Sequence, residues 1–508
     1  MVFEPNYTRV VSSIREKVGV MQTEVDVKLS AEEESISSVL SVGATATHFA
    51  SSSNGKDVNI SGLLDVKVLY EANGAPYVLD YTADFKEKYI ANELVQGELI
   101  LTGNVVDITY SVSGRDIRIK ATIEIEIDEI KNKEYNVLTS INNANVFTKT
   151  NVETYQTYEG IAQDKFEEMF EFEIKDAISI LSVQPTAKLI GVTTSDKFLT
   201  ITGKVYMDVC YKTGDTLKDI STQNFEFDFT QEIANDGIKK VSFIQSILDV
   251  VTNEMKVDYN IVEGKLKVGI NLPLLYRGYI FNEYEINAIL DIYSATHYLG
   301  VTYDNVQTMQ KQSVTLFTDK VSGMVSISES LPFIDEVVGA CINNVVLTKS
   351  EVRDYRLVVE GVISVSGVYY SKENERLNSV AIDIPFVLEE LVQYESNANT
   401  KTTLTIENIA TRSRRGKEIE VNVDINVYTE LYEITEDNFI TDVIMGDVII
   451  RDNCALTIYV VREGDTVWSI AKDMGVSPDL IYAQNDIEGE LSIGDKLVIY
   501  APSSVYVS

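Results

Sequence analysis

One apolar pattern occurs three times in this chain, and it limits the possible folds more than any other feature. In each copy a glycine stands eight residues before a tyrosine: Gly62 and Tyr70, Gly203 and Tyr211, Gly361 and Tyr369. The copies begin at Ile60, Ile201 and Val359, which lie 141 and 158 residues apart, a spacing of whole domains and not of solenoid repeats. We expect each glycine to mark a bulge or a close approach of the backbone, and each tyrosine to anchor packing.

Each copy is followed by a second landmark, a strand in which apolar and polar residues alternate. These strands cover residues 117–127, 266–272 and 419–427, and each follows a turn glycine, at Gly114, Gly264 and Gly416. A period of two is typical of a strand with one buried face, and a glycine turn before it indicates a hairpin. The predicted fold class is mainly β: three repeated antiparallel β-sandwich-like domains followed by a small βααβ domain.

The repeats suggest how the 508 residues divide. We expect an N-terminal lead-in at 1–20, β repeats at 21–150, 151–305 and 306–447, and the last domain at 457–501. Within the lead-in a short helix is expected near residues 10–18, and segments 163–172 and 245–254 could each supply a turn or two of helix. Segments 134–160 and 296–325, rich in Thr, Asn, Gln and Ser, are either linkers or extra strands.

The C-terminal segment 457–501 follows a different pattern. After a short apolar strand comes a helical stripe with the spacing i, i+3, i+4 and i+7, made by Val467, Ile470, Ala471 and Met474. Asp465 or Thr466 can cap this helix and Gly475 can end it. Ser477 and Pro478 begin a second helix, and a Gly-Asp turn leads to a last strand. The predicted order is therefore β-α-α-β.

This segment resembles a LysM domain over its whole length. LysM domains are binding modules, most often for N-acetylglucosamine polymers, and are not catalysts. The three β repeats with this segment resemble the SipL-like family of clostridial spore-coat morphogenetic proteins, whose repeats are called SPOCS domains. That resemblance implies a place in the mother-cell cytoplasm, at the forespore surface. It also implies a protein partner for the LysM domain, the coat ATPase SpoIVA, with other coat or cortex-assembly proteins as further candidates.

Composition narrows the classes of function. Acids outnumber bases by 78 to 43, and the formal charge of −35 argues against nucleic acid and anionic lipid as partners. No apolar run reaches membrane-spanning length, the first residues do not resemble a secretory signal, and three widely spaced cysteines fit a reducing cytosol. With two histidines and no phosphate-binding loop in the sequence, we expect no metal, no cofactor and no enzyme active site.

Two sets of residues in the LysM-like segment are candidate binding sites. Trp468, the single tryptophan, lies about 100° around the helix from the apolar stripe and four residues before Lys472. This pair is either a partner-binding anchor or a half-buried domain edge. A glycan or partner groove is expected between two loops, made by Gly464, Asp465, Thr466, Asn485, Asp486 and Ile487.

Charge bears on the choice between ligands for this segment. Residues 457–501 contain three bases and eight acids, and a net charge of −5 would repel the carboxylates of peptidoglycan stem peptides. The charge therefore favours a protein ligand. With the family resemblance, which implies a role in spore-coat assembly, we expect a non-enzymatic scaffold or adaptor that docks through its LysM domain. The alternative is a glycan-binding LysM protein that recognises peptidoglycan.

Overall fold

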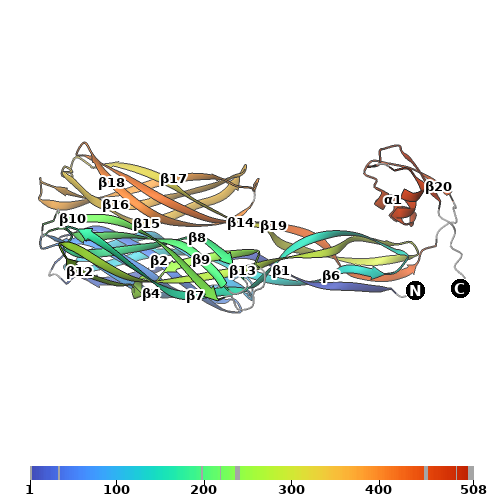
Figure 1. The fold of residues 1–508 in the computed structure, drawn as a ribbon, viewed down its shortest axis with the longest axis horizontal. Helices are drawn as coiled ribbons and strands as arrows, with labels where there is room; N and C mark the ends of the chain where they lie inside the picture. Colours follow the sequence, from blue (N-terminus) through green and yellow to red (C-terminus); the bar gives the residue numbers. More distant parts are fainter. Residues whose placement is uncertain are drawn as a thin grey trace.

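The computed structural model describes residues 3–500, apart from 33–34, 196–197, 215, 218, 235–240, 397, 451–455 and 488. Almost all of the described chain is antiparallel strand, and the two α-helices lie near the C-terminus. The predicted fold class is therefore confirmed. Three units of similar topology follow one another, and a small α/β domain completes the chain (Figure 1).

The units are built from the following strands. Unit 1 contains β1 (Glu4–Ser30), β2 (Ser38–Asn54), β3 (Asp57–Ala72), β4 (Ala75–Ile90), β5 (Glu98–Ser113) and β6 (Asp116–Asn142). Unit 2 contains β7 (Val146–Lys175), β8 (Ser179–Thr194), β9 (Phe198–Lys212), β10 (Ile220–Ala234), β11 (Phe243–Val250), the 3-10 turn η1 (Thr252–Glu254), β12 (Lys256–Val262) and β13 (Lys265–Ser294). Unit 3 contains β14 (His297–Ser326), β15 (Glu336–Arg353), β16 (Arg356–Ser371), β17 (Arg376–Leu391), β18 (Asn399–Arg414) and β19 (Glu418–Val448).

Each unit has a head made of two packed sheets. In unit 1 the sheet β2-β3-β4 faces the sheet β1-β6-β5, and the alternating strand 117–127 supplies isoleucines that are fully buried between them. Units 2 and 3 repeat this arrangement with their own cores. The turn glycines Gly114, Gly264 and Gly416 all have positive φ values, which a tight hairpin requires. The predicted hairpins are therefore present in all three units.

The repeat glycines make the predicted close approach. An ideal Cβ on Gly62 would lie 2.5 Å from Cζ of Phe85, which is its partner on the neighbouring strand. Gly203 and Gly361 are covered in the same way by Phe229 and Phe386. In each head an aromatic ring thus fills the space that the missing side chain leaves.

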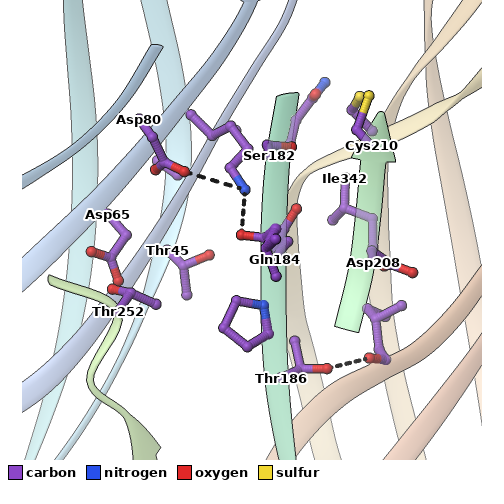
Figure 2. Close-up of a pocket in the computed structure, with 18 of the residues that line it drawn as sticks. Thr45, Asp65, Asp80, Ser182, Gln184, Thr186, Asp208, Cys210, Thr252 and Ile342 are labelled. Carbon is purple, nitrogen blue, oxygen red and sulfur yellow. Dashed lines mark hydrogen bonds and ion pairs between the residues drawn. The ribbon is translucent and has the colours of Figure 1, made fainter. Parts of the chain in front are cut away.

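The first and last strands of each unit extend beyond the head as a long antiparallel strand pair, and the three strand pairs pack together as a stalk (Figure 1). The stalk comprises residues 4–16 with 129–142, 146–162 with 278–294, and 297–310 with 433–448. All three strand pairs contribute to its apolar core, which includes Leu138, Ile289, Ile292, Ile440 and Val443. The heads lie together at the other end and enclose a cavity (Figure 2).

The stalk corrects several expectations. Residues 1–20 are not a lead-in with a short helix, because strand β1 begins at Glu4. The side chains of Val10 and Ile14 are buried on one face of this strand. Segment 163–172 belongs to β7, and 245–254 forms the end of β11 and the turn η1. Segments 134–160 and 296–325, which were expected to be either linkers or extra strands, are mostly strand. The boundaries expected near 150 and 305 fall inside β7 and β14, while the chain turns at 143–145 and 295–296.

Candidate docking site

The C-terminal domain folds from local signals in its sequence. It contains β20 (Leu456–Val460), α1 (Val467–Met474), α2 (Pro478–Gln484) and β21 (Lys496–Tyr500). Thr466 caps α1 through a reciprocal bond pair with Ser469, and Gly475 ends it with a φ of 64°. Ser477 caps α2, and Pro478 stands in its first turn. The helices pack on one face of the two-stranded sheet through a small core.

Trp468 and Lys472 converge on one carboxylate of the stalk. The indole Nε1 of Trp468 donates to Oδ2 of Asp291 at 2.7 Å, and Nζ of Lys472 donates to Oδ1 at 2.6 Å. Burial acts to raise the pKa of Asp291, but the bonds from Lys472 and Trp468 outweigh it, and the pKa is lowered. The two predicted anchor residues therefore lie together, and they contact the chain's own β13.

A tyrosine completes this contact. The hydroxyl of Tyr293 donates to the backbone carbonyl of Val476 at 2.6 Å, and its ring meets the ring of Trp468 edge-on, with centroids 5.0 Å apart. Tyr293 is 6% exposed and belongs to the same apolar cluster as the core of the C-terminal domain. Trp468 is half-buried. Two hydrogen bonds, an ion pair and an aromatic contact thus fix this domain to the end of the stalk.

The residues predicted to form a groove have mostly structural contacts. Asp465 accepts hydrogen bonds from the hydroxyl of Tyr459 and from the backbone N–H of Arg462, which closes the loop before α1. The Asn485 side chain accepts from the backbone N–H of Val498 and donates to the carbonyls of Val498 and Ile481. The remaining groove residues are used as follows: Thr466 caps α1, Ile487 packs against the domain core, and Gly464 and Asp486 are exposed.

The sheet of this domain has an apolar outer face that the sequence analysis missed. The face is formed by Leu456, Ile458, Val460, Val498 and Tyr500, whose exposed fractions range from 41% to 62%. Leu456 pairs with Tyr500 and Ile458 with Val498, so these side chains are cross-strand neighbours. In the sequence, this face is indicated by the outward apolar residues of β20, which alternate with Thr457 and Tyr459. We call this surface the outer sheet face.

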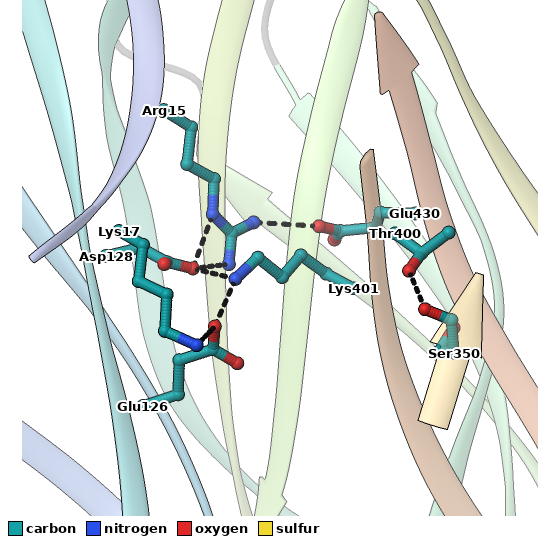
Figure 3. Close-up of polar contacts among 8 residues, drawn as sticks. All are labelled: Arg15, Lys17, Glu126, Asp128, Ser350, Thr400, Lys401 and Glu430. Atoms are coloured by element: carbon teal, nitrogen blue, oxygen red, sulfur yellow. Dashed lines mark hydrogen bonds and ion pairs between the residues drawn. The ribbon is translucent and has the colours of Figure 1, made fainter. Parts of the chain in front are cut away.

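A buried ionic network lies where the stalk joins the heads (Figure 3). Arg15 of unit 1 contacts Asp128 at 2.7 Å and Glu430 of unit 3 at 3.2 Å. Lys401 of unit 3 contacts Asp128 at 2.7 Å and Glu126 at 2.8 Å. Burial raises the pKa of Glu430 to about 7, although the charge and hydrogen bond of Arg15 act to lower it. The network links units that the sequence separates by hundreds of residues, so no local pattern could indicate it.

Within the part of the chain that the structure describes, no helix has the length and hydrophobicity to cross a bilayer, and no three His, Cys, Asp or Glu side chains are grouped to hold a metal ion. Residues 459–499 match the family model of the LysM domain. No curated protein and no solved structure matches the chain significantly. The chain thus contains a LysM domain, a type of module that binds peptidoglycan or serves in protein interactions.

Proposed function

We propose that this chain is a non-enzymatic scaffold in bacterial spore-coat assembly, and that its LysM domain docks to the coat ATPase SpoIVA at the forespore surface in the mother-cell cytoplasm. The observation that carries the proposal is the position of the LysM domain, which is held at the end of the stalk. Trp468, Lys472 and Tyr293 hold the domain there, far from the three heads (Figure 1). A binding module held at one end of a long platform suits an adaptor.

The structure offers two surfaces for such a partner. The outer sheet face is exposed and apolar, which is typical of the centre of a protein interface. Trp468 and Lys472 can contact a partner only after they leave Asp291, so a partner that uses them must supply an acidic group in its place. The net charge of −5 on the domain supports a protein ligand over an anionic glycan.

A pull-down from sporulating cells tests this proposal. Tagged full-length chain is compared with a variant that lacks residues 457–508 and with Ile458→Asp, which places a charge in the outer sheet face. Capture of SpoIVA by the full chain, with loss in both variants, is the expected result. Asp473→Asn is the control at an exposed position of α1, and it should capture SpoIVA normally. Capture that is equal in all four proteins would contradict docking through this domain.

The second candidate function is recognition of peptidoglycan. The match of residues 459–499 to the LysM domain favours it, since N-acetylglucosamine polymers are the usual ligands of that family. The exposed residues Gly464 and Asp486 are the places where a glycan would meet this domain. Co-sedimentation with purified sacculi decides between the candidates. We expect little binding at physiological salt, whereas strong, salt-insensitive binding that Asp486→Trp abolishes would establish the glycan function instead.

A further inference from the structure

Two of the three cysteines of the chain meet where the heads of units 2 and 3 pack together. Cys210 lies on β9 of unit 2, and Cys341 lies on β15 of unit 3. Both side chains pack against one apolar cluster, which contains residues of all three units. Both also line the cavity between the heads, whose volume is about 900 Å³ (Figure 2). Two thiols from distant parts of the sequence therefore lie at the wall of the same cavity.

The strands that carry the two cysteines approach each other closely at this point. Cys210 is paired with Thr222 on the neighbouring strand β10. An ideal Cβ on Gly339 of β15 would lie 3.3 Å from Oγ1 of Thr222, so β15 runs directly against this part of unit 2. Cys341 follows Gly339 by two positions in a regular stretch of β15 and therefore points to the same side of the strand. The packing of β15 on unit 2 thus directs the thiol of Cys341 toward that of Cys210.

The surroundings keep both thiols protonated at neutral pH. Burial raises the pKa of Cys210 to about 12, and the nearby thiol of Cys341 acts in the same direction. Burial also raises the pKa of Cys341, although a hydrogen bond with Ser41 and the charge of Lys67 act to lower it. Because the thiolate is the reactive form of cysteine, this pair reacts slowly and stays reduced in a reducing cytosol.

The cavity gives small molecules access to the pair. Both cysteine side chains are half-buried. Asp80 and Tyr81, which also line the cavity, are each about half exposed, so the cavity is open to solvent. Within the described ranges no third His, Cys, Asp or Glu side chain is grouped with the two thiols as a metal site requires. The arrangement therefore favours chemistry between the thiols themselves.

We propose that Cys210 and Cys341 are an oxidisable thiol pair that links units 2 and 3 by a disulfide. With hydrogen peroxide as the oxidant, one thiol attacks a peroxide oxygen, the O–O bond breaks, and a sulfenic acid and one water form. The second thiol then attacks the sulfenic sulfur, which forms the S–S bond and releases a second water. The thiols lose two electrons and two protons, and the peroxide takes up both. This inference does not depend on the proposed function.

The disulfide has a structural consequence for the heads. It closes a loop of chain that begins on β9 and ends on β15, and such a link reduces the freedom of the unfolded chain. It also joins two heads that otherwise touch only through side chains at this point. The oxidised protein should therefore unfold at a higher temperature than the reduced protein, and its second and third heads should not separate.

Thiol counting in the full chain tests this inference. Cys454→Ser removes the third cysteine and leaves the pair intact. The variant is treated with hydrogen peroxide in the folded state, denatured and labelled with a maleimide. We expect both thiols to lose their reactivity, dithiothreitol to restore it, and mass spectrometry to find the two cysteine peptides linked within one chain. The melting midpoint should rise by a few degrees on oxidation.

The matched controls are Cys210→Ser and Cys341→Ser, each combined with Cys454→Ser. Neither should form an intramolecular link or gain stability with peroxide, and melting curves confirm that each is folded. The same protein in urea shows that the peroxide treatment is sufficient to oxidise accessible thiols. Three outcomes would overturn the inference: both thiols remain free in the folded protein under that treatment, the link forms between separate chains, or the loss of reactivity is not reversed by dithiothreitol.

Discussion

Trp468 in the LysM domain donates a hydrogen bond of 2.7 Å to Asp291, a residue of β13 that lies 177 positions earlier in the chain. The same carboxylate accepts from Lys472. Asp291 and the neighbouring Tyr293, which donates to the carbonyl of Val476, therefore fix the position of the domain at the end of the stalk. Because Trp468 is the single tryptophan of the chain, its fluorescence reports this contact directly.

The first prediction concerns Asp291. Asp291→Ala removes the acceptor shared by Trp468 and Lys472, so the LysM domain should detach from the stalk and the indole should become more exposed to water. We expect the tryptophan emission to shift to longer wavelength and its quenching by iodide to increase. Asp304→Ala, a change at an aspartate elsewhere in the stalk strands, is the control and should leave the emission unchanged. An unchanged spectrum in Asp291→Ala would show that this contact does not hold the domain.

The second prediction separates docking from folding within the LysM domain. Val467 is 8% exposed in the domain core, whereas Trp468 is half-buried against the stalk. Val467→Ala should therefore destabilise the domain by about 1–3 kcal/mol and lower its melting midpoint. Trp468→Ala should release the domain from the stalk with a much smaller change in that midpoint. Differential scanning calorimetry of both variants distinguishes these outcomes, and equal losses would mean that Trp468 is a core residue of the domain.

The third prediction is a pH dependence set by Glu430. Its pKa is raised from 4.5 to about 7 by burial, so the folded protein binds this proton more tightly than the unfolded chain does. Stability from this group is full below about pH 4.5 and falls as the pH rises toward 7. Relative to Glu430→Gln, the wild type should lose roughly 1–3 kcal/mol between about pH 5 and pH 8. Urea unfolding at both pH values measures this, and parallel changes in the two proteins would contradict it.

The fourth prediction concerns the repeat glycines. Gly62→Ala places a Cβ within 2.5 Å of the Phe85 ring, which must move within a packed head. We expect a loss of about 1–3 kcal/mol and a lower urea midpoint. Gly269→Ala is the control, because the nearest atom to its new Cβ lies 4.0 Å away. If both substitutions have the same effect, close packing against the ring is not the reason for glycine at position 62.

Local patterns in the sequence were sufficient to predict the heads. The alternating strands 117–127, 266–272 and 419–427 show their buried face through a period of two, and the turn glycines mark the hairpins. The caps of the LysM helices are equally local, since Thr466 and Ser477 bond groups three residues away. These features need no information from distant parts of the chain.

The stalk and the docking contact could not be predicted in this way. Val10 and Ile14 are buried because strands of other units cover them. The sequence around these two residues contains few apolar positions, so it did not indicate that they are buried. The orientation of Trp468 depends on Asp291, and the ionic network joins Arg15 to Glu430 across units. The cavity between the heads also depends on how the three units pack, which no local pattern indicates.

Binding of purified SpoIVA to the immobilised full-length chain, with and without an N-acetylglucosamine oligomer as competitor, tests the central claim most directly. We predict saturable binding that disappears when residues 457–508 are deleted and that the oligomer does not reduce. Absence of binding to the folded full-length chain, or binding that the oligomer displaces, would contradict the account of the LysM domain as a protein-docking module.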